Sequence, residues 1–381
     1  GGFWRAVDVD LPRLEDLGDL TGRRVIVRCD LNVPVVNGRI LDDFRIRSAL
    51  PTLRYLQDAG AKVTACSHLG RPGGRADPTL AMAPVGERLR QLVPGVEVLE
   101  NLRFDPGEIA NAAEAVDRLV GGQDAYVNDA FAASHRAHAS VVGPPTRLPS
   151  AAGRLMVKEV EALGGLRGTP RRPFVTILGG AKVSDKLGVV QSLLKVVDEL
   201  LVGGGMCFTF LAAQGISIGS SLVEEGMVEW CAQLLDGGAP IRLPIDLTVL
   251  GPGGVVGNPL AGGEVRQVGG GVPDGWRGVD IGPGSAVEFC DLIAAAGTVL
   301  WNGPMGVFED DRFAAGTRTV AEAVADCRGF TVVGGGDSVA AARRFGLVDR
   351  IDHVSTGGGA TLEFIETGDL PGLAALRSGN R

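Results

Sequence analysis

The chain has 381 residues, of which 45 % are hydrophobic and 5 % are aromatic. This length favours two domains, and the apolar content supports aliphatic cores and excludes a disordered chain. The formal net charge of −8 argues against nucleic-acid binding, and no apolar run approaches the ~20 residues of a membrane span. We therefore expect a globular protein whose partners include neither nucleic acid nor membrane.

The first residues and the cysteines both indicate a cytoplasmic protein. Residues 1–10 lack the basic region and apolar core of a signal peptide. None of the six cysteines forms a CxxC pair, so we expect buried free thiols in a reducing compartment. These residues are Cys29, Cys66, Cys207, Cys231, Cys290 and Cys327.

The first half of the chain alternates short β-branched runs with helical stretches. Strands are expected at residues 24–27, 62–66, 96–99 and 125–127, and helices at 46–59 and 85–92. Such alternation is typical of a parallel sheet covered by helices on both faces, so the sequence predicts the α/β class.

The same pattern continues in the second half. A helix is expected at residues 154–163, and strands at 174–178, 199–202, 298–301 and 330–333. The glycine- and proline-rich residues 164–170 are typical of a hinge or linker. We therefore place a boundary near residue 168, between two α/β domains of similar size.

Strands of the second half run directly into glycine-rich turns. Glycine at a strand end lets the backbone approach a ligand, and the following helix points its free N–H groups there. Because ligands of α/β sheets bind at the carboxyl ends of the strands, the turns together predict a nucleotide or phosphate pocket. For any single turn, tight packing of strand against helix is the alternative. The turns are 179–182, 203–205, 302–306, 334–338 and 355–359.

Two familiar nucleotide motifs are missing. A P-loop requires Gly-Lys followed by Ser or Thr, and the chain has no Gly-Lys dipeptide. A dinucleotide fold requires GxGxxG after its first strand, whereas here Cys29-Asp30-Leu31-Asn32 follows. The predicted pocket therefore belongs to neither class.

Lysine is rare, and its placement is informative. Only five of the 37 basic residues are lysines. Lys182 and Lys186 lie on one glycine-rich turn and the helix start after it, four residues apart and so on one helix face. A lysine amine is a compact charge suited to a transferring phosphoryl group. The alternative is that both are ordinary surface lysines.

The strand-end loops of the first half carry a different chemistry. They hold arginines, histidines and two short polar side chains, a combination that suits a small polyanion because guanidinium groups bind carboxylate and phosphate oxygens in pairs. A metal site at His68, His135 and His138 is disfavoured, since no matching carboxylate pattern accompanies them. The loop residues are Asp30, Asn32, His68, Arg71, Arg103, His135 and Arg136, with Arg45 downstream.

These motifs together resemble the phosphoglycerate kinase family. In the first half they are residues 27–34 (VRCDLNVP), 67–72 (SHLGRP), 100–104 (ENLRF) and 135–138 (HRAH); in the second half they are 178–186, 203–206, 301–309 and 334–338. Their order and spacing agree with the family from about residue 14 to the C-terminus. No single motif is specific, but the combination is.

The resemblance implies two Rossmann-like three-layer α/β/α domains with mostly parallel sheets, facing each other across a cleft. Residues 1–168 would bind 3-phosphoglycerate or 1,3-bisphosphoglycerate, and residues 169–359 would bind Mg-ADP or Mg-ATP. The last residues, about 360–381, would pack back on the N-terminal domain. The implied substrate-binding residues are Asp30, Asn32, Arg45, His68, Arg71, Arg103 and Arg136.

For the second domain the resemblance implies phosphate contacts from Lys182 and Lys186 and a ribose contact from Glu309. Asp337 would help to hold Mg²⁺, the cofactor expected beside ATP or ADP as co-substrate. The implied nucleotide-binding residues are Gly180, Lys182, Lys186, Gly204, Asn302, Glu309, Gly335, Gly336, Asp337 and Ser338.

The implied reaction is the reversible phosphoryl transfer of glycolysis, from 1,3-bisphosphoglycerate to ADP to give 3-phosphoglycerate and ATP. Because the carboxylate that attacks ATP is already ionised, neither a general base nor a protein nucleophile is required. We expect direct in-line transfer, with domain closure, in a monomer. The expected catalytic groups are Arg45, Lys182 and the N–H groups of Gly335 and Gly336.

One segment departs from the family's common pattern. In the family, Gly-Thr-Ala usually follows Asp129-Ala130-Phe131, whereas this chain has Ala132-Ala133-Ser134. The loss of that glycine is expected to restrict the backbone of the substrate loop.

Two other functions stay open. A nicotinamide-dependent dehydrogenase is disfavoured by the missing glycine fingerprint, and a non-catalytic scaffold by the intact Arg45, Lys182 and Asp337.

Overall fold

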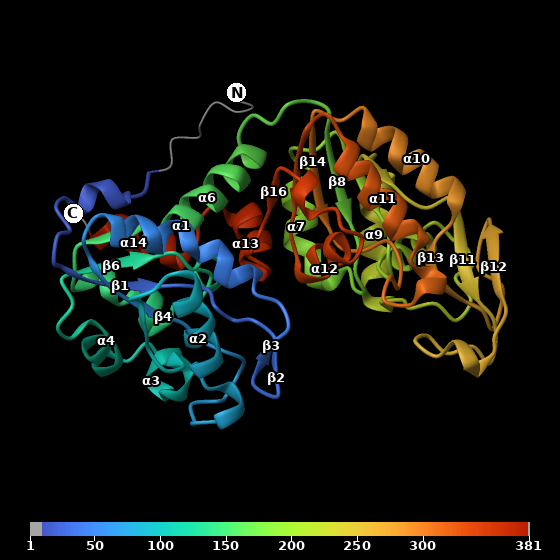
Figure 1. Cartoon of the computed structure of the whole chain (residues 1–381). Coiled ribbons are helices and arrows are strands. Elements are labelled where there is room, and N and C mark those ends of the chain that lie inside the picture. The colour runs from blue at the N-terminus through green and yellow to red at the C-terminus, as the bar shows by residue number, and fades with distance from the viewer. Residues whose placement is uncertain (1–9, 380–381) are drawn as a thin grey trace. The chain divides into compact units, whose positions relative to one another are not determined.

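The computed structural model of the chain describes residues 10–379 (Figure 1). Residues 1–9, for which no signal peptide was predicted, and residues 380–381, the end of the predicted C-terminal segment, lie outside the described residues. The described chain divides into two compact units. Residues 10–164 and 367–379 form the N-terminal unit, and residues 165–366 form the C-terminal unit.

The N-terminal unit is built on a parallel five-stranded sheet in the order β5-β4-β1-β6-β7. Four of the five residues of β1 are buried, as expected of a central strand covered on both faces. The chain leaves β1 in one direction to β4 and β5, and later in the other to β6 and β7. The switch point therefore lies between β1 and β6. The strands are β1 (Arg24–Arg28), β4 (Lys62–Cys66), β5 (Glu97–Val98), β6 (Ala125–Asn128) and β7 (Ser150–Ala152).

Helices cover both faces of this sheet. Apolar residues of α1 recur every three or four positions, and Leu53 packs with Leu89 of α2 against Val25 of β1. On the opposite face, the hydroxyl of Tyr126 in β6 donates to the carbonyl of Ser140 in α5. The helices are α1 (Phe44–Asp58), α2 (Ala83–Leu92), α3 (Pro106–Ile109), α4 (Ala113–Val120), α5 (Ala139–Val142), α6 (Arg154–Arg167) and α14 (Pro371–Gly379); a hairpin of β2 (Val35–Val36) and β3 (Arg39–Ile40) precedes α1.

The C-terminal unit contains a parallel six-stranded sheet in the order β10-β9-β8-β14-β15-β16 and a separate antiparallel sheet in the order β12-β11-β13. In the larger sheet the switch point lies between β8 and β14. The strands are β8 (Phe174–Leu178), β9 (Glu199–Val202), β10 (Ile241–Arg242), β11 (Asp246–Leu250), β12 (Val265–Gly269), β13 (Arg277–Ile281), β14 (Thr298–Asn302), β15 (Phe330–Val333) and β16 (His353–Val354).

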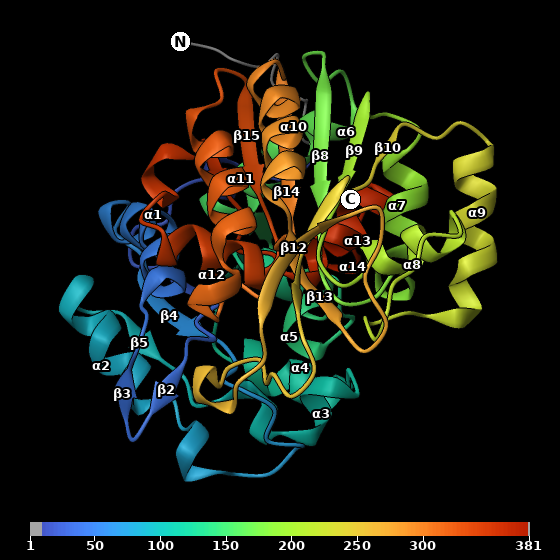
Figure 2. The same cartoon turned by 90° about the vertical axis from the view of Figure 1, so that its right-hand side faces the viewer.

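Three helices share one core on a single face of the larger sheet, where Figure 2 shows α10 and α11 beside the strands. Phe289 of α10, Val320 of α11 and Ala341 of α12 are buried there with Ile177 of β8 and Trp301 of β14. The helices of this unit are α7 (Leu187–Leu193), α8 (Cys207–Ala213), α9 (Val228–Asp236), α10 (Pro283–Ala294), α11 (Ala315–Asp326), α12 (Gly336–Arg344) and α13 (Gly359–Thr367).

The predicted α/β class is confirmed, and each predicted strand coincides with an observed one to within one residue at either end. Several strands of two or three residues were missed, because so short a segment carries no usable periodicity. The antiparallel sheet of three five-residue strands was missed as well. The predicted linker at 164–170 was partly wrong, since α6 continues to Arg167. Leu163 and Leu166, three residues apart and buried, hold this last turn despite two helical glycines that cost about 1 kcal/mol each.

The division between the units falls after residue 164, within α6, close to the boundary predicted near residue 168. Residues 360–366, expected to join the N-terminal domain, belong to the C-terminal unit, and α14 belongs to the N-terminal unit. All six cysteines are free, and four are buried as predicted, whereas Cys290 and Cys327 are partly exposed. Among residues 10–379, no helix combines the length and apolar character needed to cross a membrane.

Candidate active site

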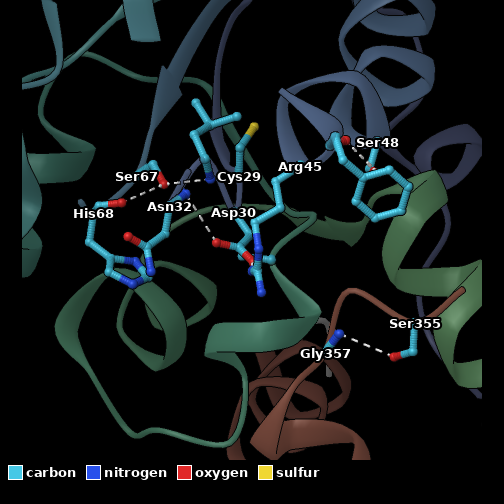
Figure 3. Close-up of polar contacts among 12 residues, drawn as sticks. Cys29, Asp30, Asn32, Arg45, Ser48, Ser67, His68, Ser355 and Gly357 are labelled. Atoms are coloured by element: carbon cyan, nitrogen blue, oxygen red, sulfur yellow. Dashed lines mark hydrogen bonds and ion pairs between the residues drawn. The ribbon is translucent and has the colours of Figure 1, made fainter. Parts of the chain in front are cut away.

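The predicted substrate residues of the N-terminal unit lie on loops that follow the carboxyl ends of β1, β4, β5 and β6, which are neighbours in the sheet. Asp30 follows β1, and the guanidinium of Arg45, in the first turn of α1, forms an ion pair with its carboxylate (Figure 3). Asp30 is buried, whereas the side chain of Arg45 is 31 % exposed. Arg45 is thus held by Asp30 while keeping part of its guanidinium accessible to an anion.

The loops after β1 and β4 are tied to each other by hydrogen bonds. The side-chain oxygen of Asn32 accepts from the N–H of Gly70 at 2.9 Å. The hydroxyl of Ser67 accepts from the N–H of Leu31 at 2.9 Å (Figure 3). The side chain of Asn32 therefore orients the loop that carries His68 and Arg71. This contact is structural, because it joins two loops of the chain.

Arg103 is a buried cation at the same edge of the sheet. Its Nη1 donates to the carbonyl of Gly70 at 3.0 Å, and Nε has no hydrogen-bond partner among the described residues. Burial, together with the neighbouring Arg28 and Arg136, lowers the pKa of Arg103 to about 10. The carboxylate of Glu108 partly offsets these positive charges. An anion bound at this edge would use the free Nε donor and compensate the remaining charge.

His68 is buried and lies against a second buried cation. Nη2 of Arg28 is 3.1 Å from its Nδ1. Burial, followed by the positive charges of Arg28 and Arg103, holds the pKa of His68 far below its usual range. The imidazole is therefore neutral at physiological pH, and it contributes a hydrogen bond rather than a charge.

The loop after β6 presents Arg136 at the surface and His135 half-buried. Burial, and then the charge of Arg136, lowers the pKa of His135. Ala132, where glycine was expected, does not adopt the left-handed backbone that favours glycine. Among the described non-glycine residues, only Asn37 and Asn111 have positive φ. This part of the substrate loop is a short 3-10 turn that any residue can adopt.

The residues that support this cluster from beneath were not predicted from the sequence. Arg28, at the last position of β1, is fully buried, and Glu108 in α3 accepts two hydrogen bonds from Ser140 in α5. Nε of Arg28 donates to the same Ser140 hydroxyl at 2.8 Å. The only signal was a charged residue, Arg28, directly after the three apolar residues of β1.

In the C-terminal unit, the glycine-rich turns pack against one another. A Cβ on Gly179 would lie 1.9 Å from the carbonyl oxygen of Pro304, and one on Gly204 would lie 2.7 Å from the amide nitrogen of Gly180. Gly204 also has a φ of +65°. Glycine is therefore required at these positions because the loops pack closely, which was the alternative given for any single turn. The same packing places the backbones of the turns around one hollow.

That hollow is a pocket of about 690 Å³, within the usual range for a small-molecule site. Its walls combine turn backbone with apolar side chains, and four predicted nucleotide residues line it: Gly180, Gly204, Glu309 and Asp337. Its other walls include Phe208, Leu222, Val256, Val279, Met305 and Val307. A flat, mostly apolar group such as a nucleobase fits this lining.

Lys186 lies behind the turns rather than on their surface. Its amine donates to the backbone carbonyl of Asn302 at 2.8 Å and to its side-chain oxygen at 2.7 Å. Burial lowers the pKa of Lys186 to about 8, opposed by the charge of Asp337. The amide nitrogen of Asn302 has no partner among the described residues and remains available to an acceptor.

The helix α12 begins beside this pair. A Cβ on Gly335 would lie 3.0 Å from the amide nitrogen of Asn302, whereas Gly336 faces open space. Asp337 is exposed in the first turn, so free N–H groups and a carboxylate share the helix start. Ser338, in contrast, is fully buried and accepts from the N–H of Gly303, which gives its hydroxyl a structural use.

Lys182 is exposed on the turn after β8. The carboxylate of Glu224 accepts from the N–H groups of Val183 and Ser184. Burial raises the pKa of Glu224, but the hydrogen bonds from Ser184 and Val183, followed by the charge of Lys182, lower it overall. Glu224 therefore holds the turn that carries Lys182. Glu309 is also exposed, at the rim of the pocket.

Within residues 10–379, no group of three or more His, Cys, Asp or Glu side chains could hold a metal ion. A cation near Asp337 would therefore need oxygen ligands from a bound nucleotide. Mg²⁺ is usually held in this way, by one or two carboxylates together with substrate phosphates and water. The donor set at the start of α12 fits that ion.

The fold and these two sites define a class of enzyme. One α/β unit carries a cationic site for a small polyanion, and another carries a pocket suited to a nucleotide, which together describe a two-domain phosphotransferase.

The particular family follows from the comparisons. The family model "Phosphoglycerate kinase" matches residues 14–98 and 94–368, and the chain belongs to this family. The phosphoglycerate kinase of Rubrobacter xylanophilus is 49 % identical over 393 residues, covering 97 % of this chain and 98 % of that one. That of Salinispora tropica is 50 % identical over 401 residues, covering 96 % and 99 %.

Solved structures agree. The phosphoglycerate kinase of Coxiella burnetii has a TM-score of 0.87 at 37 % identity, and that of Pyrococcus horikoshii has a TM-score of 0.83 at 32 %. Each comparison covers 97 % of this chain and 99 % of the other.

Proposed function

We propose that this chain catalyses the glycolytic, reversible transfer of a phosphoryl group between 1,3-bisphosphoglycerate and ADP. Membership of the family supports the reaction, and one observation supports the substrate class on the chain itself. Buried Arg103 keeps a guanidinium nitrogen without a partner among neighbouring cations, at the edge of the sheet where Arg45, Arg71 and Arg136 also lie. An anion that carries both phosphate and carboxylate would compensate this charge.

Binding of the phosphoglycerate falls to the N-terminal unit in this proposal. The arginines would hold its phosphate and carboxylate, His68 would donate to an oxygen, and Asp30 would keep Arg45 in place. Asn32 would orient the loop after β4. The proposed substrate-binding residues are therefore Asp30, Asn32, Arg45, His68, Arg71, Arg103 and Arg136.

Binding of the nucleotide falls to the C-terminal unit. The base would enter the pocket, Glu309 at its rim would hold the ribose, and the phosphates would extend toward Asn302 and the start of α12. Gly180, Gly204, Lys182 and Lys186 complete the proposed set. Ser338 would contribute indirectly, by holding the turn at Gly303.

Asp337 would hold Mg²⁺ together with nucleotide phosphate oxygens. When bound, the ion supplies positive charge at those oxygens and orients them. All other steps rest on the chain's own residues. The substrate carboxylate is the nucleophile toward ATP, so the protein positions two anions rather than moving a proton.

Transfer itself depends on cations and N–H groups that meet the moving phosphoryl group. We assign these roles to Lys182, Arg45 and the N–H groups of Gly335 and Gly336. In transit the phosphoryl group carries charge on three oxygens, and preorganised donors stabilise that charge better than water does. Because the acyl phosphate is readily hydrolysed, water must be excluded during the step.

Since the two substrates bind to different units, we also infer that the units approach each other during turnover, in a cytoplasmic monomer. Small-angle scattering with both substrates present should show compaction, and light scattering should give the mass of one chain. An unchanged radius of gyration with both ligands bound would contradict closure.

A coupled assay tests the reaction. ATP, Mg²⁺ and 3-phosphoglycerate are supplied, and a dehydrogenase reports 1,3-bisphosphoglycerate through loss of NADH. We expect turnover that EDTA abolishes and that Mg²⁺ restores. Folded protein that binds ADP without turnover would contradict the proposal and favour a scaffold.

A further inference from the structure

Arg28 is fully buried and uses its guanidinium in three directions. Nε donates to the Ser140 hydroxyl at 2.8 Å, Nη1 donates to the carbonyl of Cys29 at 2.6 Å, and Nη2 lies 3.1 Å from Nδ1 of His68. A guanidinium with partners on all three nitrogens has little freedom to rotate. Its position relative to the imidazole is therefore set by the fold.

An acidic group on the far side anchors the guanidinium. Glu108, itself buried, accepts from the Ser140 hydroxyl at 2.6 Å and from the Ser140 amide at 2.9 Å. Because the Ser140 hydroxyl donates its hydrogen to Glu108, its oxygen is left to accept from Arg28. The Ser140 hydroxyl thus links a buried negative charge to a buried positive one.

The chemistry of arginine then decides the state of His68. A guanidinium has donors and no acceptor, so the ring nitrogen facing it must carry a lone pair. Nδ1 of His68 is therefore unprotonated, and in a neutral ring the proton resides on Nε2. The side chains of Arg28, Arg103, Arg45 and His138 all oppose a second proton on this ring, since each lowers its pKa.

Building on the proposed function, we propose that Arg28 holds His68 as the neutral Nε2–H tautomer, which makes His68 a dedicated hydrogen-bond donor to an oxygen of the phosphoglycerate. Within the described residues, Nε2 of His68 makes no hydrogen bond, so its donor is free for a ligand. Arg28 is a positioning residue in this scheme, because it acts through His68.

The tautomer can be measured without turnover. The chain has four histidines, so the protein labelled with ¹⁵N in its histidines gives few signals, and His68→Gln identifies the one of interest. We expect Nδ1 of His68 to show the shift of an unprotonated nitrogen, Nε2 that of an N–H, and no titration through the neutral range. A protonated Nδ1, or an imidazolium near neutrality, would overturn the proposal, whether or not the protein is active.

The dependence on Arg28 is tested with Arg28→Met, which should release the ring to a mixture of tautomers. Arg24→Met is the matched control, because Arg24 lies on the same strand with its side chain 58 % exposed. Its His68 signals should equal those of the wild type. If Arg28→Met does not fold, Arg28→Lys takes its place, because one amine cannot reach Ser140, Cys29 and His68 at the same time. A variant whose tautomer stays fixed would show that Arg28 is not the cause.

Kinetics add a readout that a purely structural role would not give. The amide nitrogen of glutamine can stand in for Nε2 and that of asparagine for Nδ1, so His68→Gln should retain more affinity for 3-phosphoglycerate than His68→Asn. Arg28→Met should raise the KM for 3-phosphoglycerate about tenfold, the value of one charged hydrogen bond, and leave the KM for ATP unchanged. Equal changes in both KM values, or His68→Asn as the better variant, would count against donation from Nε2. Absent turnover in the wild type would reject the proposed function instead.

Discussion

The two units recognise anions by different means. In the N-terminal unit the candidate site is made of side chains, five of which are arginines or histidines on loops after neighbouring strands. In the C-terminal unit it is made largely of backbone, with glycine turns around a pocket and few charged groups. A small substrate with fixed charges suits arginine forks, whereas a nucleotide has a large apolar base that suits a pocket.

The difference has a cost in each unit. The N-terminal site crowds cations, so the pKa values of Arg103 and His68 are lowered, and Arg28 requires the buried Glu108 as a counter-charge. The C-terminal site crowds backbones, so Gly179 and Gly204 cannot accept a side chain. Substitutions should therefore act mainly through charge in one unit and through shape in the other.

The largest exception should be Lys182, a charge in the unit dominated by backbone. We expect Lys182→Ala to lower kcat by about 10²–10³, on the order of 3–4 kcal/mol, because the charge is used in the transition state. Lys195→Ala is the control, since Lys195 is also exposed in this unit but lies outside the pocket. Unchanged turnover of Lys182→Ala would remove it from the catalytic groups.

In the N-terminal unit, Arg45→Met should lower kcat/KM for 3-phosphoglycerate by about 10- to 100-fold. The substitution removes a charged hydrogen bond to the substrate and leaves buried Asp30 without its partner. Arg47→Met provides the comparison two residues away on α1. Arg47 is 54 % exposed and pairs with Asp43, so its loss should cost less than about 0.5 kcal/mol. Similar kinetics for the two variants would show that Arg45 has no special role.

In the C-terminal unit, the addition of one methyl group to a glycine turn should destabilise the fold. Gly204→Ala forces a positive φ on alanine and brings Cβ within 3 Å of Gly180 and Pro304. We expect a loss of about 1–3 kcal/mol, seen as a fall in Tm of several degrees, and a higher KM for ATP. Gly226→Ala, with ordinary φ and nothing within 4 Å, should melt as the wild type does.

The smallest expected effect is a pH dependence of nucleotide binding. Burial lowers the pKa of Lys186 to about 8, so above this pH the free protein has a neutral amine. Phosphates favour the charged form, so binding then takes up a proton, and affinity for ADP should fall by up to about tenfold per pH unit above 8 and stay level below it. Calorimetry in buffers of different ionisation enthalpy would detect the proton.

Lys186→Met tests the assignment of that slope. The variant should bind ADP more weakly. Its affinity should not change between pH 7.5 and 9, because residue 186 no longer titrates. A slope that persists in Lys186→Met would point to another group, and a flat profile in the wild type would mean that Lys186 stays charged.

The sequence predicted the candidate site of each unit to a different extent. Loop arginines such as Arg103 could be expected from strand order, because the carboxyl ends of parallel strands meet at one edge. The pocket could be expected from its glycines, but its size and the placement of Glu309 at its rim could not. Ser338 was expected to face the nucleotide, yet its hydroxyl is buried against Gly303.

The sequence by itself determined the α/β class, the principal strands and the family, because hydrophobic period and motif order are local properties of the chain. Only the tertiary structure decided which charges are buried and which partners they find. Arg28, Ser140 and Glu108 are far apart in sequence, and nothing local marks them as one hydrogen-bonded chain. Burial and hydrogen-bond geometry arise when α3 and α5 pack beside β1, and they set the protonation of His68 that no sequence pattern encodes.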